Sequence, residues 1–262
     1  MLMQALCRVA PRRHRVYRLI SRLAPDRYEV YRVEGGLIYL NLHEHPMMVQ
    51  MAMGTYESAK QAMIRRHLRA GMTFIDAGAN RGYFTLQAAR LVGSSGRVIA
   101  IEPAPENHSY LEKSIELNGY SHTRALPIAL SDHDGTASLQ ILGRSTEHTL
   151  APLDPKYKDL PKVTVPIRTL DAVVAQENLG RVDMIKIDVQ ELELEVLRGS
   201  VQTLRDNPHI VMFLDLPKRI EMRSAIADFL APYGFTYFPD CKETAPTREI
   251  PRAGPEVAAI RI

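Results

Sequence analysis

Short apolar runs alternate with segments of helical periodicity along most of the chain. The runs are strand-sized and rich in Val, Ile, Leu and Phe, as in "VIAIE" and "IVMFLD". The segments between them repeat apolar residues every three to four positions, which predicts amphipathic helices. This alternation predicts an α/β fold with a doubly wound, mostly parallel, Rossmann-like sheet of seven strands. Strands are expected at 73–78, 97–103, 124–130, 182–189, 209–216, 234–240 and 256–262, and helices at 55–71, 83–92, 106–117, 192–204 and 219–231.

The first 50 residues follow a different pattern. "YEVYRV" and "LIYLNL" alternate with period two on either side of Glu34-Gly35-Gly36, which predicts a β-hairpin. We therefore divide the chain into an N-terminal extension, residues 1–50, and a main domain, residues 51–262. A basic amphipathic helix is expected before the hairpin, with apolar positions at Leu6, Val9, Val16, Leu19, Ile20 and Leu23.

Two segments of the main domain are expected at its surface. "SDHDGTASLQIL", residues 131–142, turns at Asp134-Gly135 and predicts a surface hairpin. Residues 143–162 contain Pro152, Pro155 and Pro161 and are expected to form a loop that covers a site as a lid.

The positive charge of the chain is confined to its beginning. Residues 1–25 contain no acid and hold six arginines: Arg8, Arg12, Arg13, Arg15, Arg18 and Arg22. The net charge is +3, and without these six the chain has 27 basic and 30 acidic residues. Two interpretations stay open: a helix packed on its own domain with arginines in solvent, or a helix lying on an anionic membrane surface.

The composition excludes several classes of protein. No Lys/Arg stripe with interleaved aromatics follows the extension, so no nucleic-acid partner is expected. No apolar run approaches the ~18 residues of a membrane span. Two cysteines, Cys7 and Cys241, near opposite ends favour a reducing compartment and hence a cytoplasmic location, with possible peripheral membrane contact through residues 1–25.

Candidate chemistry begins at the first predicted strand, which ends in "FIDAGANRGYF". Gly78 and Gly82 flank a tight turn into a helix, and Glu102 ends the next strand, where a carboxylate can accept both hydroxyls of a ribose. A nicotinamide fingerprint would need glycine at 78, 80 and 83, but Asn80 and Tyr83 stand there. Asp76 would repel a pyrophosphate and suits an ammonium. A ligand with a ribose and an ammonium but no pyrophosphate indicates S-adenosylmethionine.

These motifs occur together and in order over roughly residues 53–215. "GTYE", "FIDAGANRGYFTL", "GRVIAIEPAPENHSYLEKSIELNG", "IALSDHDGTASL", "RTLDAVV" and "VDMIKIDVQELELEVLRG" resemble the FkbM family of S-adenosylmethionine-dependent O-methyltransferases. The resemblance implies a class I methyltransferase fold and an acceptor hydroxyl on a sugar, glycolipid or natural product. Some members of that family use a divalent metal such as Mg²⁺.

The resemblance also implies roles for single residues. Asp76, Gly78, Asn80 and Gly82 would line the methionine part of the cofactor, Glu102 would hold the ribose, and Asp132 would lie by the adenine. Tyr83 and Pro103, inside the same motifs, are expected in the cofactor site as well. The acceptor pocket is expected to involve the hairpin at 28–42, the loop 143–162 and residues 216–219.

The strand in "DMIKIDV" carries two charges that an all-apolar strand would lack. Asp188 ends it, at the edge of the sheet where the methyl acceptor is expected, so it could orient a hydroxyl, accept its proton or hold a metal. Lys186 lies on the same strand face and could keep Asp188 ionised or form a structural ion pair. Asp215 ends the following strand. We expect these three to be catalytic.

The chain departs from the family pattern I-D-V-E-G-x-E directly after Asp188. Gln190 replaces an acid and Glu191 replaces a turn glycine, while Glu193 is expected in the first turn of a helix together with Glu195. Metal dependence is therefore doubtful.

A non-enzymatic alternative, an S-adenosylmethionine-binding scaffold with impaired catalysis, stays open. Methylation of base amino groups is disfavoured, because the chain has no Pro-Pro of an N/D-P-P-Y/F motif.

Overall fold

The central feature of the computed structural model is one seven-stranded sheet. The structure describes residues 13–141, 160–241, 246–251 and 254–261. The strand order is β11-β12-β10-β9-β3-β4-β5, and β12 runs antiparallel to both of its neighbours while β3, β4, β5, β9 and β10 pair in parallel. The seven predicted strands are confirmed: β3 (Thr73–Ala77), β4 (Arg97–Ile101), β5 (Thr123–Leu126), β9 (Met184–Ile187), β10 (Val211–Asp215), β11 (Thr236–Pro239) and β12 (Glu256–Ile260).

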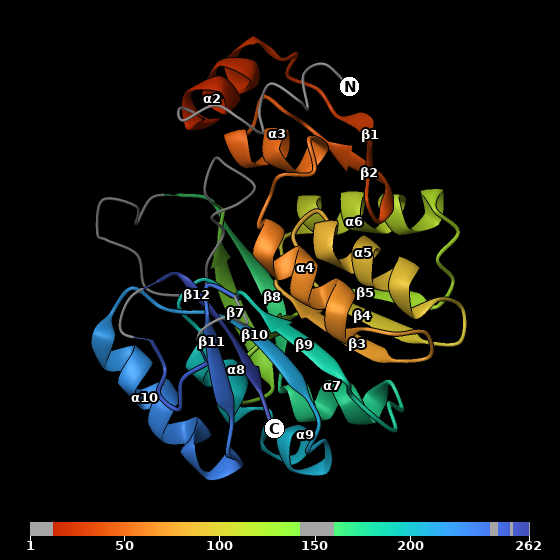
Figure 1. Ribbon diagram of the computed structural model, residues 1–262. Coiled ribbons are helices and arrows are strands. Elements are labelled where there is room, and N and C mark those ends of the chain that lie inside the picture. Colours follow the sequence, from red (N-terminus) through yellow and green to blue (C-terminus); the bar gives the residue numbers. More distant parts are fainter. Residues whose placement is uncertain (1–12, 142–159, 242–245, 252–253, 262) are drawn as a thin grey trace.

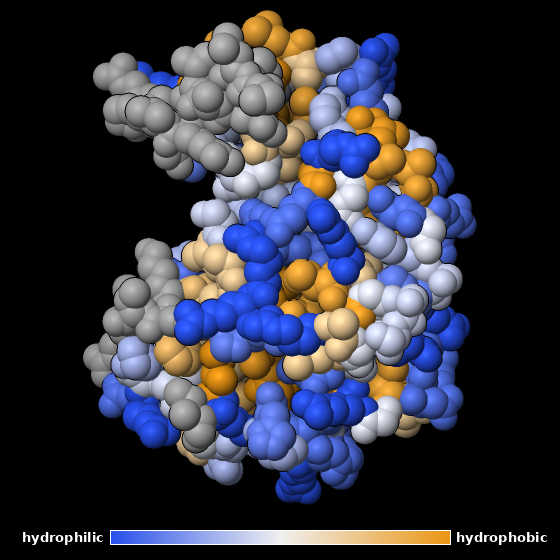
Figure 2. All heavy atoms as spheres, turned by 45° about the vertical axis from the view of Figure 1, so that its right-hand side comes forward, coloured by the Kyte–Doolittle hydropathy of each residue, from blue (hydrophilic) through white to orange (hydrophobic). Residues whose placement is uncertain are grey.

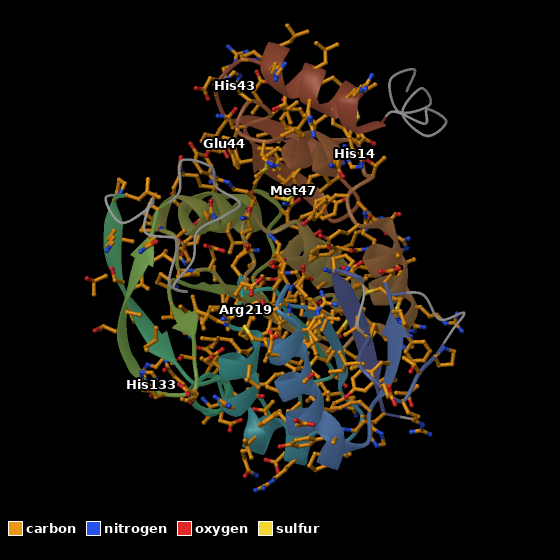
Figure 3. All side chains as sticks on the ribbon, turned by 90° about the vertical axis from the view of Figure 1, so that its left-hand side faces the viewer. His14, His43, Glu44, Met47, His133 and Arg219 are labelled. Atoms are coloured by element: carbon orange, nitrogen blue, oxygen red, sulfur yellow. The ribbon has the colours of Figure 1, made fainter. Side chains whose placement is uncertain are left out.

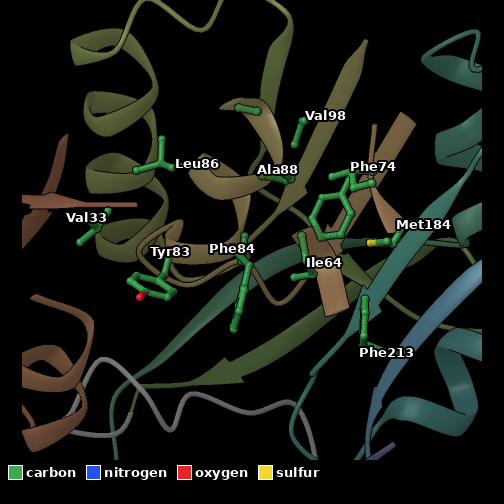
Figure 4. Packing of buried hydrophobic residues seen from close by; sticks show 14 of the residues in the cluster. Val33, Ile64, Phe74, Tyr83, Phe84, Leu86, Ala88, Val98, Met184 and Phe213 are labelled. Atoms are coloured by element: carbon green, nitrogen blue, oxygen red, sulfur yellow. The ribbon is translucent and has the colours of Figure 1, made fainter. Parts of the chain in front are cut away.

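Helices cover both faces of this sheet (Figure 1). Successive residues of β3 belong to different hydrophobic clusters, Phe74 to one face and Ile75 to the other, because side chains of a strand alternate in direction. Figure 4 shows Phe74, Met184 and Phe213 from three strands packed with Ile64 and Phe84. The first face carries α4 (Ser58–His67), α5 (Tyr83–Val92) and α6 (Pro105–Leu117), and the second carries α7 (Leu170–Gln176), α8 (Glu193–Arg198), α9 (Val201–Asp206) and α10 (Ile220–Leu230).

The N-terminal extension consists of α2 (Arg13–Leu23), the hairpin β1 (Glu29–Val33) and β2 (Gly36–Leu40), and α3 (Pro46–Ala52). The predicted hairpin is confirmed, and a Cβ on Gly35 in its turn would lie 2.4 Å from backbone atoms of α5, so glycine is required there. Residue 50, the expected boundary, falls inside α3. Ile38 and Met48 join the same core cluster as Phe74, so the extension shares its core with the main domain.

The predicted third strand, 124–130, ends earlier than expected. Pro127 has no backbone N–H, so the ladder stops at Leu126, and β6 (Ala129–Leu130) belongs to a second sheet with β7 (Gly135–Gln140) and β8 (Lys162–Arg168). The predicted surface hairpin at 131–142 is wrong, because β7 pairs antiparallel with β8. Of the expected loop 143–162, residues 143–159 lie outside the described residues, and Lys162 already begins β8.

One predicted helix is divided. The expected helix 192–204 forms two short helices, α8 and α9, with Gly199 and Ser200 between them. A Cβ on Gly199 would lie 2.2 Å from the carbonyl oxygen of Ser131, so this close contact with the second sheet requires glycine.

Within the described parts of the chain, no helix combines the length and hydropathy needed to cross a bilayer.

Candidate active site

A cavity of about 190 Å³ lies at the carboxyl ends of β3, β4, β9 and β10. The chain moves outward from β3 to β5 and then returns to β9 on the other side, so this is the switch point where open α/β sheets bind ligands. Met47 and Met51 of α3 close the cavity from the extension, and Figure 3 shows Met47 where the extension meets the main domain. Eight predicted site residues line it: Gly78, Asn80, Tyr83, Glu102, Pro103, Lys186, Asp188 and Asp215.

The loop after β3 makes close backbone contact with the end of β9. A Cβ on Gly78 would lie 1.8 Å from the carbonyl oxygen of Asp188, and Gly78 has a φ of +78°. The backbone N–H groups of Gly78 and Ala79 both donate to the carbonyl oxygen of Ile101 at 3.0 Å. Gly82, with a φ of +89°, is the N-cap of α5 and stands outside the lining. The loop is therefore held to both neighbouring strands at the cavity floor.

Glu102 is fixed at the end of β4 by backbone donors. Its Oε2 accepts from the N–H of Asn80 at 2.8 Å, and its Oε1 accepts from the N–H of Ala104 at 2.9 Å. Burial raises the pKa of Glu102, and these two hydrogen bonds counteract that rise. Asn107 Nδ2 also donates to Oε1 at 3.5 Å, whereas Oε2 keeps a lone pair for a further donor. A ligand with two adjacent hydroxyls fits this orientation.

Arg81 joins the same loop to the extension. Its side chain is fully buried, donates to the carbonyl oxygen of Glu106 at 3.2 Å and forms an ion pair with Glu44 at 3.1 Å. Its guanidinium lies 4.8 Å from the ring centroid of Tyr28 and 5.2 Å from that of Tyr110, within cation–π range. Sequence reasoning missed Arg81, because an arginine in a turn usually faces solvent.

Lys186 is buried between two carboxylates. Its Nζ lies 3.3 Å from Oδ1 of Asp76 and 3.5 Å from Oδ2 of Asp188, and it donates to the carbonyl oxygen of Gly78 at 3.1 Å. Burial lowers the pKa of Lys186, but the charges of Asp76 and Asp188 outweigh burial and raise it overall. Thr85 Oγ1 donates to Asp76 Oδ2 at 2.6 Å, and Asp76 does not line the cavity. The Lys186 ammonium thus occupies the place beside Asp76 that we expected for a cofactor ammonium.

A second buried lysine organises the end of β10. Lys60 Nζ lies 2.7 Å from Glu57 Oε2, 2.9 Å from Asp215 Oδ1 and 2.7 Å from Glu256 Oε2. Glu57 and Asp215 line the cavity as well. Sequence reasoning missed Lys60 and Glu256. The available signal was the "GTYE" motif, whose Glu57 lies three residues before Lys60 on α4.

Two acids near the cavity have strongly raised pKa values. Burial, followed by the charge of Asp188, raises the pKa of Asp215 to about 7, although Lys60 counteracts both effects. Burial raises the pKa of Glu193 to about 8. A carboxyl group with a pKa near neutrality can exchange protons at physiological pH. Asp215 has both this property and a place in the lining.

The departures from the family pattern form an unusual turn between β9 and α8. Gln190 has a φ of +57° and Glu191 a φ of +76°, so the left-handed conformation persists although the glycine is absent. Glu193 Oε1 accepts from the N–H of Val189 at 3.2 Å and of Glu191 at 3.3 Å. The prediction that Glu193 and Glu195 lie in the first turn of a helix is confirmed. Gln190 Nε2 donates to Asp188 Oδ1 at 3.2 Å.

The remaining walls differ from expectation. Ala129, Leu130 and Leu139 of the second sheet form an apolar wall, whereas Asp132 lies outside the lining with a side chain that is 40% exposed and bonded to His133. Figure 3 shows His133 at the outer edge of the second sheet, far from Met47. The hairpin at 28–42 and residues 216–219 contribute nothing to the lining; the extension contributes α3 instead.

The residues present do not fit a divalent metal. No group of three or more His, Cys, Asp or Glu side chains suited to a metal occurs in the described ranges of the chain. The carboxylates that could contribute are held by ammonium groups, Asp188 by Lys186 and Asp215 by Lys60. We therefore assign no catalytic step to a metal.

The sheet and its cavity define a class of protein. The strand order, with the antiparallel β12 between β10 and β11, is that of class I methyltransferases, and the cavity lies at its switch point. Residues 76–237, more than half of the chain, match the family described as the methyltransferase FkbM domain, and the chain belongs to this family.

The chain spans little more than half the length of the first curated relatives that it matches. "Methyltransferase 1" of Beauveria bassiana is 31% identical over 145 residues, which cover 48% of this chain and 57% of that protein. The crystal structure of the methyltransferase FkbM from Methylobacillus flagellatus KT aligns with a TM-score of 0.49 and 11% identity, over 95% of this chain and 59% of that one. M. jannaschii TYW2 in complex with AdoMet aligns with a TM-score of 0.49 and 14% identity, over 91% and 88% of the two chains.

Proposed function

We propose that the protein is an S-adenosylmethionine-dependent O-methyltransferase that acts on a hydroxyl of a sugar, glycolipid or other natural product. One observation carries the proposal: Glu102 and loop residues 78–80 line one cavity together with Asp188 and Asp215. Glu102 and the loop suit a nucleoside cofactor, and Asp188 and Asp215 supply carboxylates that can accept a proton from the methyl acceptor. Membership of the FkbM family supports the same chemistry. The two-cysteine composition further suggests a cytoplasmic location.

The lining offers a place for each part of the cofactor. Glu102, fixed by two backbone donors, would accept the ribose hydroxyls, and the apolar wall of Leu130 and Leu139 would cover the adenine. Gly78 and Asn80 would flank the methionine part. When bound, S-adenosylmethionine supplies a methyl group already activated by its sulfonium charge. The protein must then align an acceptor oxygen and remove one proton.

The two carboxylates at the ends of β9 and β10 suit that task. Asp188 would accept a hydrogen bond from the acceptor hydroxyl and so orient its oxygen. Asp215, with a pKa of about 7, can take up the proton and release it to solvent at neutral pH. Lys186 and Lys60 keep the carboxylates in position and reduce repulsion between them. A cavity rich in carboxylates also suits a polyhydroxyl acceptor, which offers many donors.

A panel assay tests the proposal. Methyl-labelled S-adenosylmethionine is incubated with the protein and with nucleotide sugars, glycolipids and phenolic natural products, and the products are located by mass spectrometry. We expect label on oxygen. Label only on nitrogen or carbon would refute the proposal.

The alternative of an impaired scaffold rests on Gln190 and Glu191. Both residues adopt a left-handed backbone conformation in the turn beside Asp188, and Gln190 Nε2 donates to one carboxylate oxygen of Asp188. A scaffold would bind S-adenosylmethionine in calorimetry without turnover on any acceptor. Turnover that appears only after Gln190→Glu combined with Glu191→Gly would support the scaffold.

A further inference from the structure

Helix α2 packs against the extension through one narrow face. Tyr17 is 3% exposed and contacts Val49 of α3, and its hydroxyl shares a hydrogen bond of 3.1 Å with Thr55 Oγ1. Ser21, one turn later, is also buried, and its hydroxyl donates to the carbonyl oxygen of His43 at 3.3 Å. These contacts fix the orientation of the helix, so its other faces have defined directions.

The next face of α2 exposes apolar side chains. Val16 is 36% exposed, Leu19 is 58% exposed and Leu23 is 75% exposed. At about 100° per residue, these three positions fall within about 60° of one another around the helix axis. Figure 2 shows hydrophobic surface at the end of the molecule where Figure 1 places α2. A row of exposed aliphatic side chains is costly in water and indicates a surface that becomes covered.

Arginines occupy the side of α2 next to this apolar row. Arg15, Arg18 and Arg22 are exposed, and together they span about 60° of the helix, adjacent to Leu19. The helix contains no acidic residue. Within the part of the chain that the structure describes, none of the three arginines has an ion-pair partner. Three exposed positive charges beside three exposed aliphatic residues form a surface that suits a partner both anionic and apolar.

We propose that α2 docks on the surface of a lipid bilayer that contains anionic lipids. The arginines would lie among phosphate and carboxylate headgroups while Val16, Leu19 and Leu23 enter the acyl boundary. A duplex nucleic acid would leave the aliphatic row in water, and a purely apolar protein partner would leave the arginines unpaired. Since α2 packs on α3, whose Met47 and Met51 line the cavity, docking would place the extension side of the cavity toward the membrane.

Vesicle binding by the full chain tests this inference without requiring any methyl transfer. Sedimentation is measured with vesicles of phosphatidylcholine alone and of phosphatidylcholine with roughly 30% phosphatidylserine. We expect binding only to the second kind, and weaker binding as salt increases, because surface charges are screened. Leu19→Ser with Leu23→Ser is expected to reduce the partition coefficient at least tenfold. Arg15→Gln with Arg18→Gln and Arg22→Gln should reduce it at least as much.

Ile220→Ser is the matched control, because Ile220 is 59% exposed and lies on α10, a helix of the main domain. It should bind like the wild type. Thermal melting and S-adenosylmethionine affinity confirm that each variant is folded. The proposal is overturned if the wild type does not bind anionic vesicles, or if the α2 variants bind as the wild type does. It is also overturned if sedimentation equilibrium shows that the wild type is a dimer and the Leu19→Ser/Leu23→Ser variant is a monomer, since a second copy then covers this face.

Discussion

Lys60 and Asp215 lie 155 residues apart in the sequence and form an ion pair of 2.9 Å at the wall of the cavity. The Lys60 side chain is 1% exposed, and the same ammonium also contacts Glu57 and Glu256. Burial lowers the pKa of Lys60, but the three carboxylates outweigh burial and raise it, so the lysine is charged throughout the physiological range.

Removing the Lys60 ammonium should therefore be costly. Lys60→Met leaves three neighbouring acids without their cation, and we expect the free energy of unfolding to fall by about 3 kcal/mol or more. Urea denaturation measures this loss. Glu256→Gln removes only one of the three acids and should cost much less. An unchanged urea midpoint in Lys60→Met would show that the ion pairs contribute nothing to stability.

Cofactor affinity should depend on Glu102 and not on Asp132. Glu102→Ala removes the carboxylate that two backbone N–H groups fix at the end of β4, and we expect S-adenosylmethionine to bind at least tenfold more weakly, or about 1.4 kcal/mol. Calorimetry measures the affinity. Asp132→Asn is the control, because its side chain lies outside the cavity and pairs with His133. Equal affinities for all three proteins would refute the assignment of Glu102.

The raised pKa of Glu193 predicts how stability changes with pH. Its pKa is about 8 in the folded protein against an ordinary 4.5, so between these values the folded state binds more protons than the unfolded state. The free energy of unfolding should consequently decrease as pH rises from about 5 to about 8. Glu193→Gln keeps a neutral acceptor for the turn and removes the titration, so its stability should decrease less over the same range. Urea midpoints at several pH values measure both slopes, and parallel slopes would contradict the prediction.

The strands of the main sheet were predictable because parallel strands buried on both faces must be apolar, as "IVMFL" is. The second sheet was missed for a local reason: β8 contains Pro166 and exposes alternate residues, so its pattern is weaker. Helix α3 has seven residues and the short α8 and α9 have six each, too few for a clear helical period.

The cofactor half of the site was easier to predict than the acceptor half. Gly78 and Glu102 follow strand ends within one local motif, so their positions follow from the order of elements. Lys60 reaches Asp215 only because α4 packs beside β10, which no local pattern reveals. Arg81 likewise becomes buried only when Tyr28 and Glu44 of the extension cover it.

Glu191 should lower the stability of its turn. Its φ of +76° is unfavourable for any residue with a Cβ, and glycine there should raise the free energy of unfolding by about 1 kcal/mol. The Glu191 side chain also accepts from the N–H of Lys218 at 3.1 Å. Glu191→Ala is the control, because it loses this acceptor and keeps the Cβ, so it should not be stabilised. Thermal denaturation of both variants separates backbone strain from the lost hydrogen bond.

The last prediction separates a catalytic Asp188 from a structural one. Asp188 and Asp76 both contact Lys186, at 3.5 Å and 3.3 Å, but only Asp188 lines the cavity. Asp188→Asn should leave S-adenosylmethionine affinity nearly unchanged and reduce kcat by roughly 10²-fold or more, the usual effect of losing a general base or an orienting carboxylate. Asp76→Asn also removes one negative charge beside Lys186, but on the side away from the acceptor. The kcat of this variant should therefore fall far less. Single-turnover rates on an acceptor found in the panel assay measure the difference. If both substitutions reduce kcat equally, Asp188 acts only as a partner of Lys186 and the catalytic assignment is wrong.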